Sequence, residues 1–144
     1  MGTPMRTAKD RLRHAISFEI IGLFLVIPLG ALAFGHPLLD IGMVAVVSSI
    51  IATAWNYAYN VIFDHALLRL SGRVAKTVLI RVLHACLFEA GLLVILIPFI
   101  AWYLAIALSE AFLMDLGLAV FYLIYAFCFN WAYDVIFPIP QPKG

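Results

Sequence analysis

Two glutamates lie inside apolar stretches of the sequence, and each ends the same run of residues. Glu19 closes the segment R-L-R-H-A-I-S-F-E that begins at Arg11, and Glu89 closes R-V-L-H-A-C-L-F-E that begins at Arg81. A carboxylate in apolar surroundings is costly unless it binds a cation, takes up a proton or faces a polar interior. A proton and a cation compete for such a carboxylate, and this competition is the minimum requirement for exchanging one against the other.

A second set of polar and aromatic residues recurs at helical spacing near the level of Glu19. Asn56, Asn60 and Asp64 are four residues apart and therefore share one face of a helix. Asn60 and Asn56 lie about 6 and 12 Å inward from Asp64, which brackets the depth of about 9 Å expected for Glu19. A carboxylate among amides and aromatic rings suits a lipophilic organic cation. The predicted binding pocket comprises Phe18, Trp55, Asn56, Tyr59, Asn60 and Asp64.

Each of these residues also has a simpler interpretation. Glu19 could be a buried structural acid, and the asparagines could hold helices together by hydrogen bonds. Asp40 and Asp115 are expected to be helix N-caps. Interfacial anchoring is the first expectation for Trp102, Tyr103, Trp131 and Tyr133. A relay or modulatory role is open for Arg11, His14, Arg81, His84, Glu89, Asn130 and Asp134.

The elements that carry these residues are predicted to be four transmembrane helices. The chain has 144 residues, of which 65% are hydrophobic and 12% charged, and its mean hydropathy is +1.07. Apolar stretches cover residues 16–34, 41–63, 77–108 and 111–137. Each can cross a hydrocarbon core of about 30 Å, which takes about 20 helical residues. The alternating pattern of a β-barrel is absent.

The placement of positive charge predicts the topology. All nine Lys and Arg residues lie before the first stretch, around the connection between the second and third, or after the fourth. Both termini and the central connection are therefore expected on the cytoplasmic side. The basic start and the segment Ala31-Leu32-Ala33 also resemble a cleavable signal peptide. We expect the first helix to be retained, because a similar segment recurs later in the chain.

The chain is predicted to be a tandem duplication. W-N-Y-A-Y-N-V-I-F from Trp55 returns as F-N-W-A-Y-D-V-I-F from Phe129, at an offset of 74 residues, whereas the glutamate segments repeat at an offset of 70. The expected parts are a cytoplasmic segment (1–10), a first hairpin (11–68), a cytoplasmic linker (69–80), a second hairpin (81–138) and a tail (139–144). Two hairpins that enter the membrane in the same direction imply a pseudo-twofold axis along the membrane normal.

Enzyme and metal-site signatures are not found in the sequence. It contains no Gly-rich phosphate loop, nucleophile elbow, H-E-x-x-H or C-x-x-C. The four histidines are scattered, and Cys86 and Cys128 are expected to be reduced fillers within spans. We therefore expect neither catalysis, nor a metal, nor a nucleic-acid partner.

The two motifs R-x-x-H-A-x-x-F-E and W-N-x-x-x-N-x-x-F-D resemble those of the proteobacterial antimicrobial compound efflux family, whose hairpin is the bacterial transmembrane pair domain. The similarity covers residues 11 to about 137. It implies an inner-membrane exporter with no cofactor, driven by the proton gradient and dimeric. The implied substrates are cationic biocides such as chlorhexidine, acriflavine-like dyes and quaternary ammonium compounds, or short-chain diamines. In such a protein Glu19 would couple proton movement to export.

The second copy departs from the family motif that closes the second span. Asp134 stands in place of Asn60, and Pro138 stands where Asp64 would be. We therefore expect Glu19 to be the working site and Glu89 a structural or modulatory counterpart. The rival functions are a membrane scaffold without transport activity and a cation leak channel.

Overall fold

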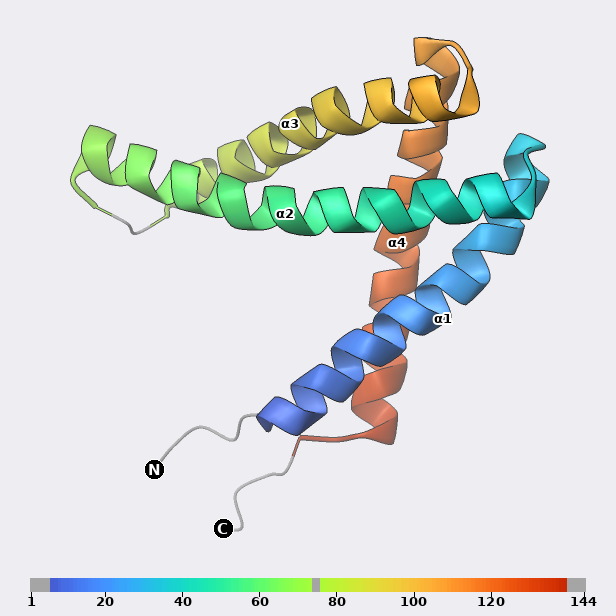
Figure 1. The fold of residues 1–144 in the computed structure, drawn as a ribbon. Helices are drawn as coiled ribbons and strands as arrows, with labels where there is room; N and C mark the ends of the chain where they lie inside the picture. The colour runs from blue at the N-terminus through green and yellow to red at the C-terminus, as the bar shows by residue number, and fades with distance from the viewer. Residues whose placement is uncertain (1–5, 74–75, 140–144) are drawn as a thin grey trace. The chain divides into compact units, whose positions relative to one another are not determined.

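The computed structural model describes residues 6–73 and 76–139, and helices make up almost all of both ranges. The four helices are α1 (Ala8–Phe34), α2 (Leu38–Ser71), α3 (Val78–Leu104) and α4 (Leu108–Ile136), and Figure 1 shows their course. The described ranges contain no strand. All four helices are long and apolar enough to cross a membrane, which confirms the predicted all-α membrane fold.

The ends of α1 and α3 show the duplication in local chemistry. Thr7 and Thr77 are equivalent N-caps, and each side-chain hydroxyl accepts a hydrogen bond from a backbone N–H three residues later. Gly35 and Ala105 are equivalent C-caps in the left-handed region, at φ values of 69° and 53°. The caps explain why α1 begins well before its apolar stretch: the charged residues after Thr7 continue the helix.

Asp40 and Asp115 are not helix caps, and that prediction is wrong. Asp40 is the third residue of α2, whereas Asp115 is the eighth residue of α4. An N-cap residue must lie outside the helical backbone conformation. The error arose because the apolar stretches begin later than the helices do.

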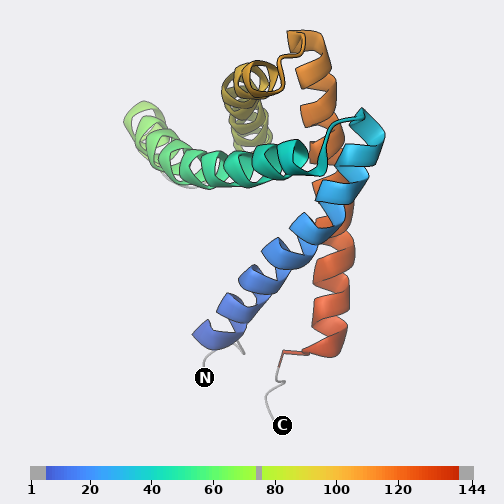
Figure 2. The same cartoon turned by 45° about the vertical axis from the view of Figure 1, so that its right-hand side comes forward.

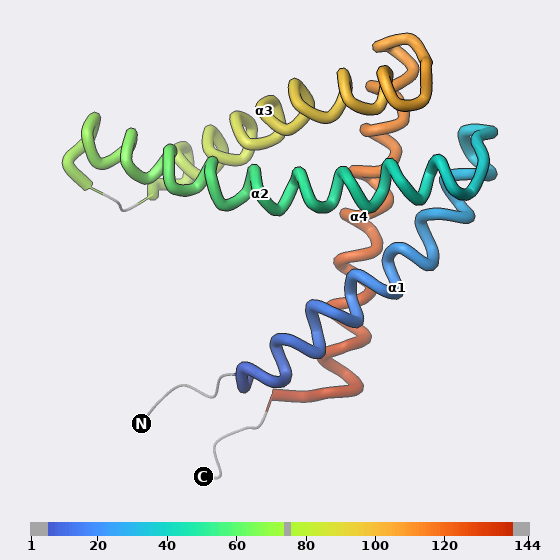
Figure 3. The backbone as a smooth tube through the Cα atoms, in the orientation of Figure 1, coloured from blue at the N-terminus to red at the C-terminus, as the bar shows by residue number. Residues whose placement is uncertain are grey.

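The helices form two compact units that differ from the two repeats. Unit 1 contains residues 1–41 and 116–144, and unit 2 contains residues 42–115. In unit 1, α1 runs beside α4 from Leu116 onward (Figure 2). In unit 2, α2 from Gly42 onward runs beside α3 (Figure 3). Each unit thus packs a helix of one repeat against a helix of the other.

Small residues allow the helices of unit 1 to approach closely. Gly22, Val26 and Gly30 are buried and recur every four residues along one face of α1. The ring of Tyr125 lies 3.0 Å from the position that a Cβ atom of Gly22 would occupy. Without a hydrophobic driving force between helices in lipid, such close packing is a main source of their association.

Candidate functional site

In unit 1, the first copy of the glutamate motif contacts α4. His14 donates from Nε2 to Asn130 Oδ1 at 2.7 Å, and the hydroxyl of Tyr125 donates to the backbone carbonyl of Phe18 at 2.8 Å. The ring of Phe18 also packs against Tyr125 and Phe129, with centroids 4.8 and 5.3 Å apart. We call this contact the α1–α4 seam.

Glu19 lies at the edge of the α1–α4 seam. It follows Phe18 and precedes Gly22 by three residues, so it flanks the face of α1 that packs on α4. Tyr122 and Tyr125 both contact the Gly22 position and are close enough to Glu19 for electrostatic interaction. Glu19 itself is exposed on α1, and these two tyrosines of α4 contact the neighbouring Gly22 position.

In unit 2, the second copy of the glutamate motif contacts α2 through the same kinds of hydrogen bond. His84 donates from Nε2 to Asn60 Oδ1 at 3.0 Å, the hydroxyl of Tyr59 donates to the His84 carbonyl at 2.7 Å, and Trp55 Nε1 donates to the Phe88 carbonyl at 3.1 Å. The Tyr59 and Phe88 rings lie 5.4 Å apart. We call this contact the α2–α3 seam.

The predicted polar stripe on α2 is bonded mainly along its own helix and to α3. Asn60 Nδ2 donates to the side-chain and backbone oxygens of Asn56, and Asp64 forms an ion pair of 2.8 Å with Lys76. The residues expected to form one pocket are thus divided between the units. Phe18 and Glu19 belong to unit 1, and the others to unit 2: Trp55, Asn56, Tyr59, Asn60 and Asp64.

The two seams are built from equivalent residues in different registers. His84 bonds Asn60, whereas its counterpart His14 bonds Asn130, which is the counterpart of Asn56. Tyr59 bonds the carbonyl of His84, whereas its counterpart Tyr133 bonds Asp10, one turn before His14. The even-numbered helix is therefore offset by four residues, about 6 Å, between the two seams. The motif offsets of 74 and 70 residues differ by this same amount.

This offset places Asp134 in a charged network at the end of unit 1. Arg6 pairs with both Asp134 and Asp10, and Asp10 also pairs with Arg13. Tyr133 donates to Asp10 Oδ1 at 2.8 Å and accepts from Arg13 Nε at 2.9 Å. Hydrogen bonds to Asp10 and Asp134 raise the pKa of Arg6, so this guanidinium stays charged. Asp134 was a candidate from the sequence, whereas its partners were not, because they lie outside the repeated motif.

The remaining candidates lie on α1 and α3. Arg11 belongs to the first part of α1, and Arg81 donates from Nε to the backbone carbonyl of Lys76 at 3.3 Å. Glu89 is exposed on α3 and interacts electrostatically with Asp115 of the same unit. Asp115 is buried, with 8% of its surface exposed. Sequence reasoning missed it as a site residue because it resembled a helix cap.

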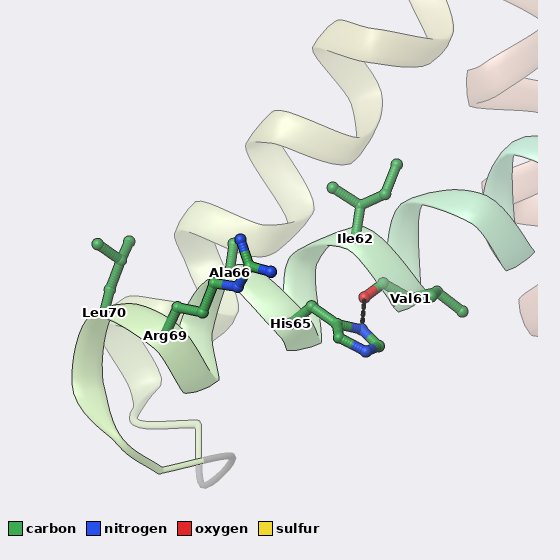
Figure 4. A pocket seen from close by; sticks show the side chains of 6 residues that line it. All are labelled: Val61, Ile62, His65, Ala66, Arg69 and Leu70. Carbon is green, nitrogen blue, oxygen red and sulfur yellow. Dashed lines mark hydrogen bonds between the residues drawn. The ribbon is translucent and has the colours of Figure 1, made fainter.

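A shallow hollow on α2 offers no comparable chemistry. Its lining residues come from one helix, as Figure 4 shows, and His65 Nδ1 is bonded to the carbonyl of Val61 at 2.7 Å. A surface made by one helix alone cannot enclose a ligand. Within the described ranges, no group of three or more His, Cys, Asp or Glu side chains could hold a metal. Cys86 and Cys128 are free and exposed.

A family model described as chlorhexidine efflux transporter matches the chain twice, over residues 6–69 and 76–139. The chain belongs to this family. The two matches confirm the tandem duplication, and they confirm the family that the glutamate and asparagine motifs indicated. Members of the chlorhexidine efflux transporter family are transporters rather than enzymes.

Curated relatives cover nearly the whole chain. A short-chain diamines transporter of Vibrio parahaemolyticus is 38% identical over 137 residues, which is 95% of this chain and 96% of the relative. Short-chain diamines transporters of Acinetobacter baumannii and Acinetobacter baylyi are 37% and 34% identical, and each match covers 92% of this chain and at least 90% of the relative. No solved structure matches the chain. The chlorhexidine efflux transporter family thus supplies the coarse function, transport across a membrane.

Proposed function

We propose that this protein exports organic cations in exchange for protons, with Glu19 as the carboxylate that binds each in turn. The observation that carries the proposal is the position of Glu19, inside a helix long and apolar enough to cross a membrane and within electrostatic range of Tyr122 and Tyr125. An acid at such a depth is a functional candidate by default. The aromatic rings add cation–π attraction that acts on an ammonium group and not on a neutral carboxylic acid.

The proposed cycle needs only competition at one site. A cation from the cytoplasm binds the ionised carboxylate of Glu19 and crosses the membrane with the site. A proton then takes its place on the opposite side, because a neutral carboxylic acid is the form that apolar surroundings favour. Release of that proton into the cytoplasm restores the ionised carboxylate. The proton gradient is the energy source, and no cofactor takes part.

The proposed substrates are short-chain diamines and larger cationic biocides, including chlorhexidine, acriflavine-like dyes and quaternary ammonium compounds. The names of the family and of the curated relatives support this class. Both kinds of molecule carry permanent or protonated nitrogen. A carboxylate with aromatic rings in its neighbourhood recognises that charge with little regard to the rest of the molecule, which suits a transporter of several cations.

The second seam is proposed as a supporting site. Trp55, Tyr59 and Asn60 bond the second motif copy, and Glu89 supplies its carboxylate. Asn56 and Asp64 belong to the same polar stripe of α2. His14 and His84 are candidate proton relays, since each imidazole is held by one asparagine through Nε2. We propose Glu89 as a modulatory counterpart of Glu19, with Arg11, Arg81, Asn130 and Asp134 positioning the seams.

The proposed setting is the bacterial cytoplasmic membrane, with both termini on the cytoplasmic side and two copies per assembly. The one-sided placement of all nine basic residues supports this topology. Each seam is formed mainly by two helices, which cannot enclose a path by themselves, so a second copy would help to shield the path from lipid.

Export from energised vesicles tests the proposal. Wild-type protein should export a fluorescent cation in a manner abolished by an uncoupler, and Glu19→Gln should lower the rate at least about tenfold, the equivalent of about 1.4 kcal/mol. Glu110→Gln is the matched control, because Glu110 is an exposed acid in the first turn of α4. Its export should equal that of the wild type.

Two outcomes would overturn the proposal. Uncoupler-sensitive export by Glu19→Gln at the wild-type rate would remove Glu19 from the coupling site. A folded wild-type protein that binds no cation, combined with a Glu19→Gln protein that loses its oligomeric state, would favour the scaffold function. Flux that follows voltage without dependence on pH would favour a leak channel.

A further inference from the structure

Apart from three tyrosines, Asp115 is the only buried side chain with a polar group among the described residues, at 8% exposed. It is the eighth residue of α4 and lies about 10 Å along the helix from Leu108. Ala111 and Met114 precede it on the same face, and they are 0% and 2% exposed. The acid therefore belongs to the buried face of α4 and not to its exposed surface.

The buried side chains that unit 2 contributes from the other helices are aliphatic, apart from one tyrosine. They are Val44, Ala45 and Tyr59 on α2 and Leu96 and Ile100 on α3, and the Tyr59 hydroxyl donates to the His84 carbonyl. Ser48, one turn further along the buried face of α2, has a buried hydroxyl with no hydrogen-bond partner among the described residues. The core of unit 2 thus contains the Asp115 carboxyl and the Ser48 hydroxyl in a mainly apolar setting.

No positive charge compensates Asp115 within the ranges that the structure describes. No ion pair or hydrogen bond joins its carboxylate to another described residue. Glu89 on α3 interacts with it electrostatically, but carries the same sign. The other acids of these helix ends are Asp40 and Glu110, which lie in the first turns of α2 and α4.

An ionised carboxylate in such a place would be strongly unfavourable, because it has lost water and gained only a like charge. A proton on the carboxylate removes the charge and the repulsion together. We propose that Asp115 is a second proton-binding site of this transporter, on α4 and separate from Glu19, whose charge state is linked to that of Glu89. This inference rests on the proposed proton coupling for its role in transport, but the binding of the proton can be observed without transport.

The duplication explains how the site arose and supplies its control. L-D-I-G-M from Leu39 resembles M-D-L-G-L from Met114, which makes Asp40 the counterpart of Asp115. Asp40 is the third residue of its helix, whereas Asp115 is the eighth. The five additional residues of α4 move the acid about 7.5 Å further from the helix start. The same acid is therefore half-exposed in one repeat and buried in the other.

Infrared difference spectroscopy of the full chain in lipid vesicles tests the assignment. Between low and high pH, the wild type should show a protonated-carboxyl C=O band that is absent from Asp115→Asn and displaced in frequency in Asp115→Glu. The control Asp40→Asn should keep the wild-type band. Glu89→Gln should change the pH at which the band disappears, because it removes the neighbouring charge.

The outcomes separate this inference from the proposed function. A wild-type band that persists unchanged in both Asp115 variants would overturn the proton site, even if Glu19→Gln abolishes export. If Asp115→Asn fails to fold, the displaced band of Asp115→Glu decides the question. Loss of the band in Asp115→Asn supports the proton site even if export proves independent of Glu19.

Discussion

At the residue scale, the seams depend on side chains that donate hydrogen bonds to the backbone of the facing helix. Tyr125 bonds the carbonyl of Phe18, and Trp55 bonds the carbonyl of Phe88, which is the same motif position in the other copy. A helix carbonyl that accepts a second hydrogen bond fixes where the partner helix lies. The residue beside the motif glutamate is thereby held in place in both units.

Removal of one such donor should weaken the α1–α4 seam measurably. Tyr125→Phe keeps the ring contacts with Phe18 and Phe129 and removes only the hydroxyl. We expect a loss of about 0.6 kcal/mol of stability, the average for hydrogen bonds between membrane helices. Reversible unfolding in mixed detergent measures it, and Tyr57→Phe, at an exposed tyrosine, is the control. Equal losses in both variants would contradict the role of this bond.

Gly91 shows how tightly the α2–α3 seam is packed. A Cβ atom at Gly91 would lie 2.2 Å from Cζ2 of Trp55. Gly91→Ala should therefore displace the Trp55 ring and destabilise the protein by about 1–3 kcal/mol. The double variant Gly91→Ala with Trp55→Leu should recover part of this loss. If Gly91→Ala unfolds at the same denaturant concentration as the wild type, the close contact is absent.

At the element scale, the informative feature is the four-residue offset between the seams. The sequence predicts four helices, the duplication and the identity of the motif residues, because each depends on local pattern. It does not predict that α1 packs on α4 and α2 on α3. Hydropathy indicates that a helix lies in lipid or in a protein core, but it does not identify the helix that packs against it. The different offsets of the two motif halves, 70 and 74 residues, were the signal for the change of register.

Thiol crosslinking tests the register. In a protein with Cys86 and Cys128 replaced by alanine, His84→Cys should crosslink efficiently to Asn60→Cys through a short bifunctional reagent, because these side chains are bonded in the structure. The counterpart pair in unit 1 is His14→Cys with Asn130→Cys. His84→Cys with Asn56→Cys should react more slowly, since Asn56 lies one turn away. A preference for Asn56 over Asn60 would contradict the offset.

At the scale of the whole molecule, charge placement and helix length both indicate a protein that crosses the membrane with four helices. The positive charges lie near the two chain termini and near the α2–α3 connection. The two units within this chain each combine helices from both repeats. Tertiary packing produces this combination. No periodic pattern in the sequence indicates which helices pack against each other.

Labelling of single cysteines tests the proposed orientation. With the native cysteines replaced, Ser109→Cys should react with a membrane-impermeant maleimide in intact cells. Ser109 lies at the start of α4, which the proposed topology puts on the outer side of the membrane. Ser71→Cys, at the end of α2, should react only after the cells are permeabilised. The reverse pattern would place the termini outside.

Proton release on cation binding would show directly whether the two ligands compete for Glu19. Purified protein is mixed with a short-chain diamine in weakly buffered solution at several pH values, and the released protons are counted with an indicator dye. We expect proton release from the wild type that is lost in Glu19→Gln and kept in Glu110→Gln. Cation binding by the wild type without proton release, or release that persists in Glu19→Gln, would contradict this competition.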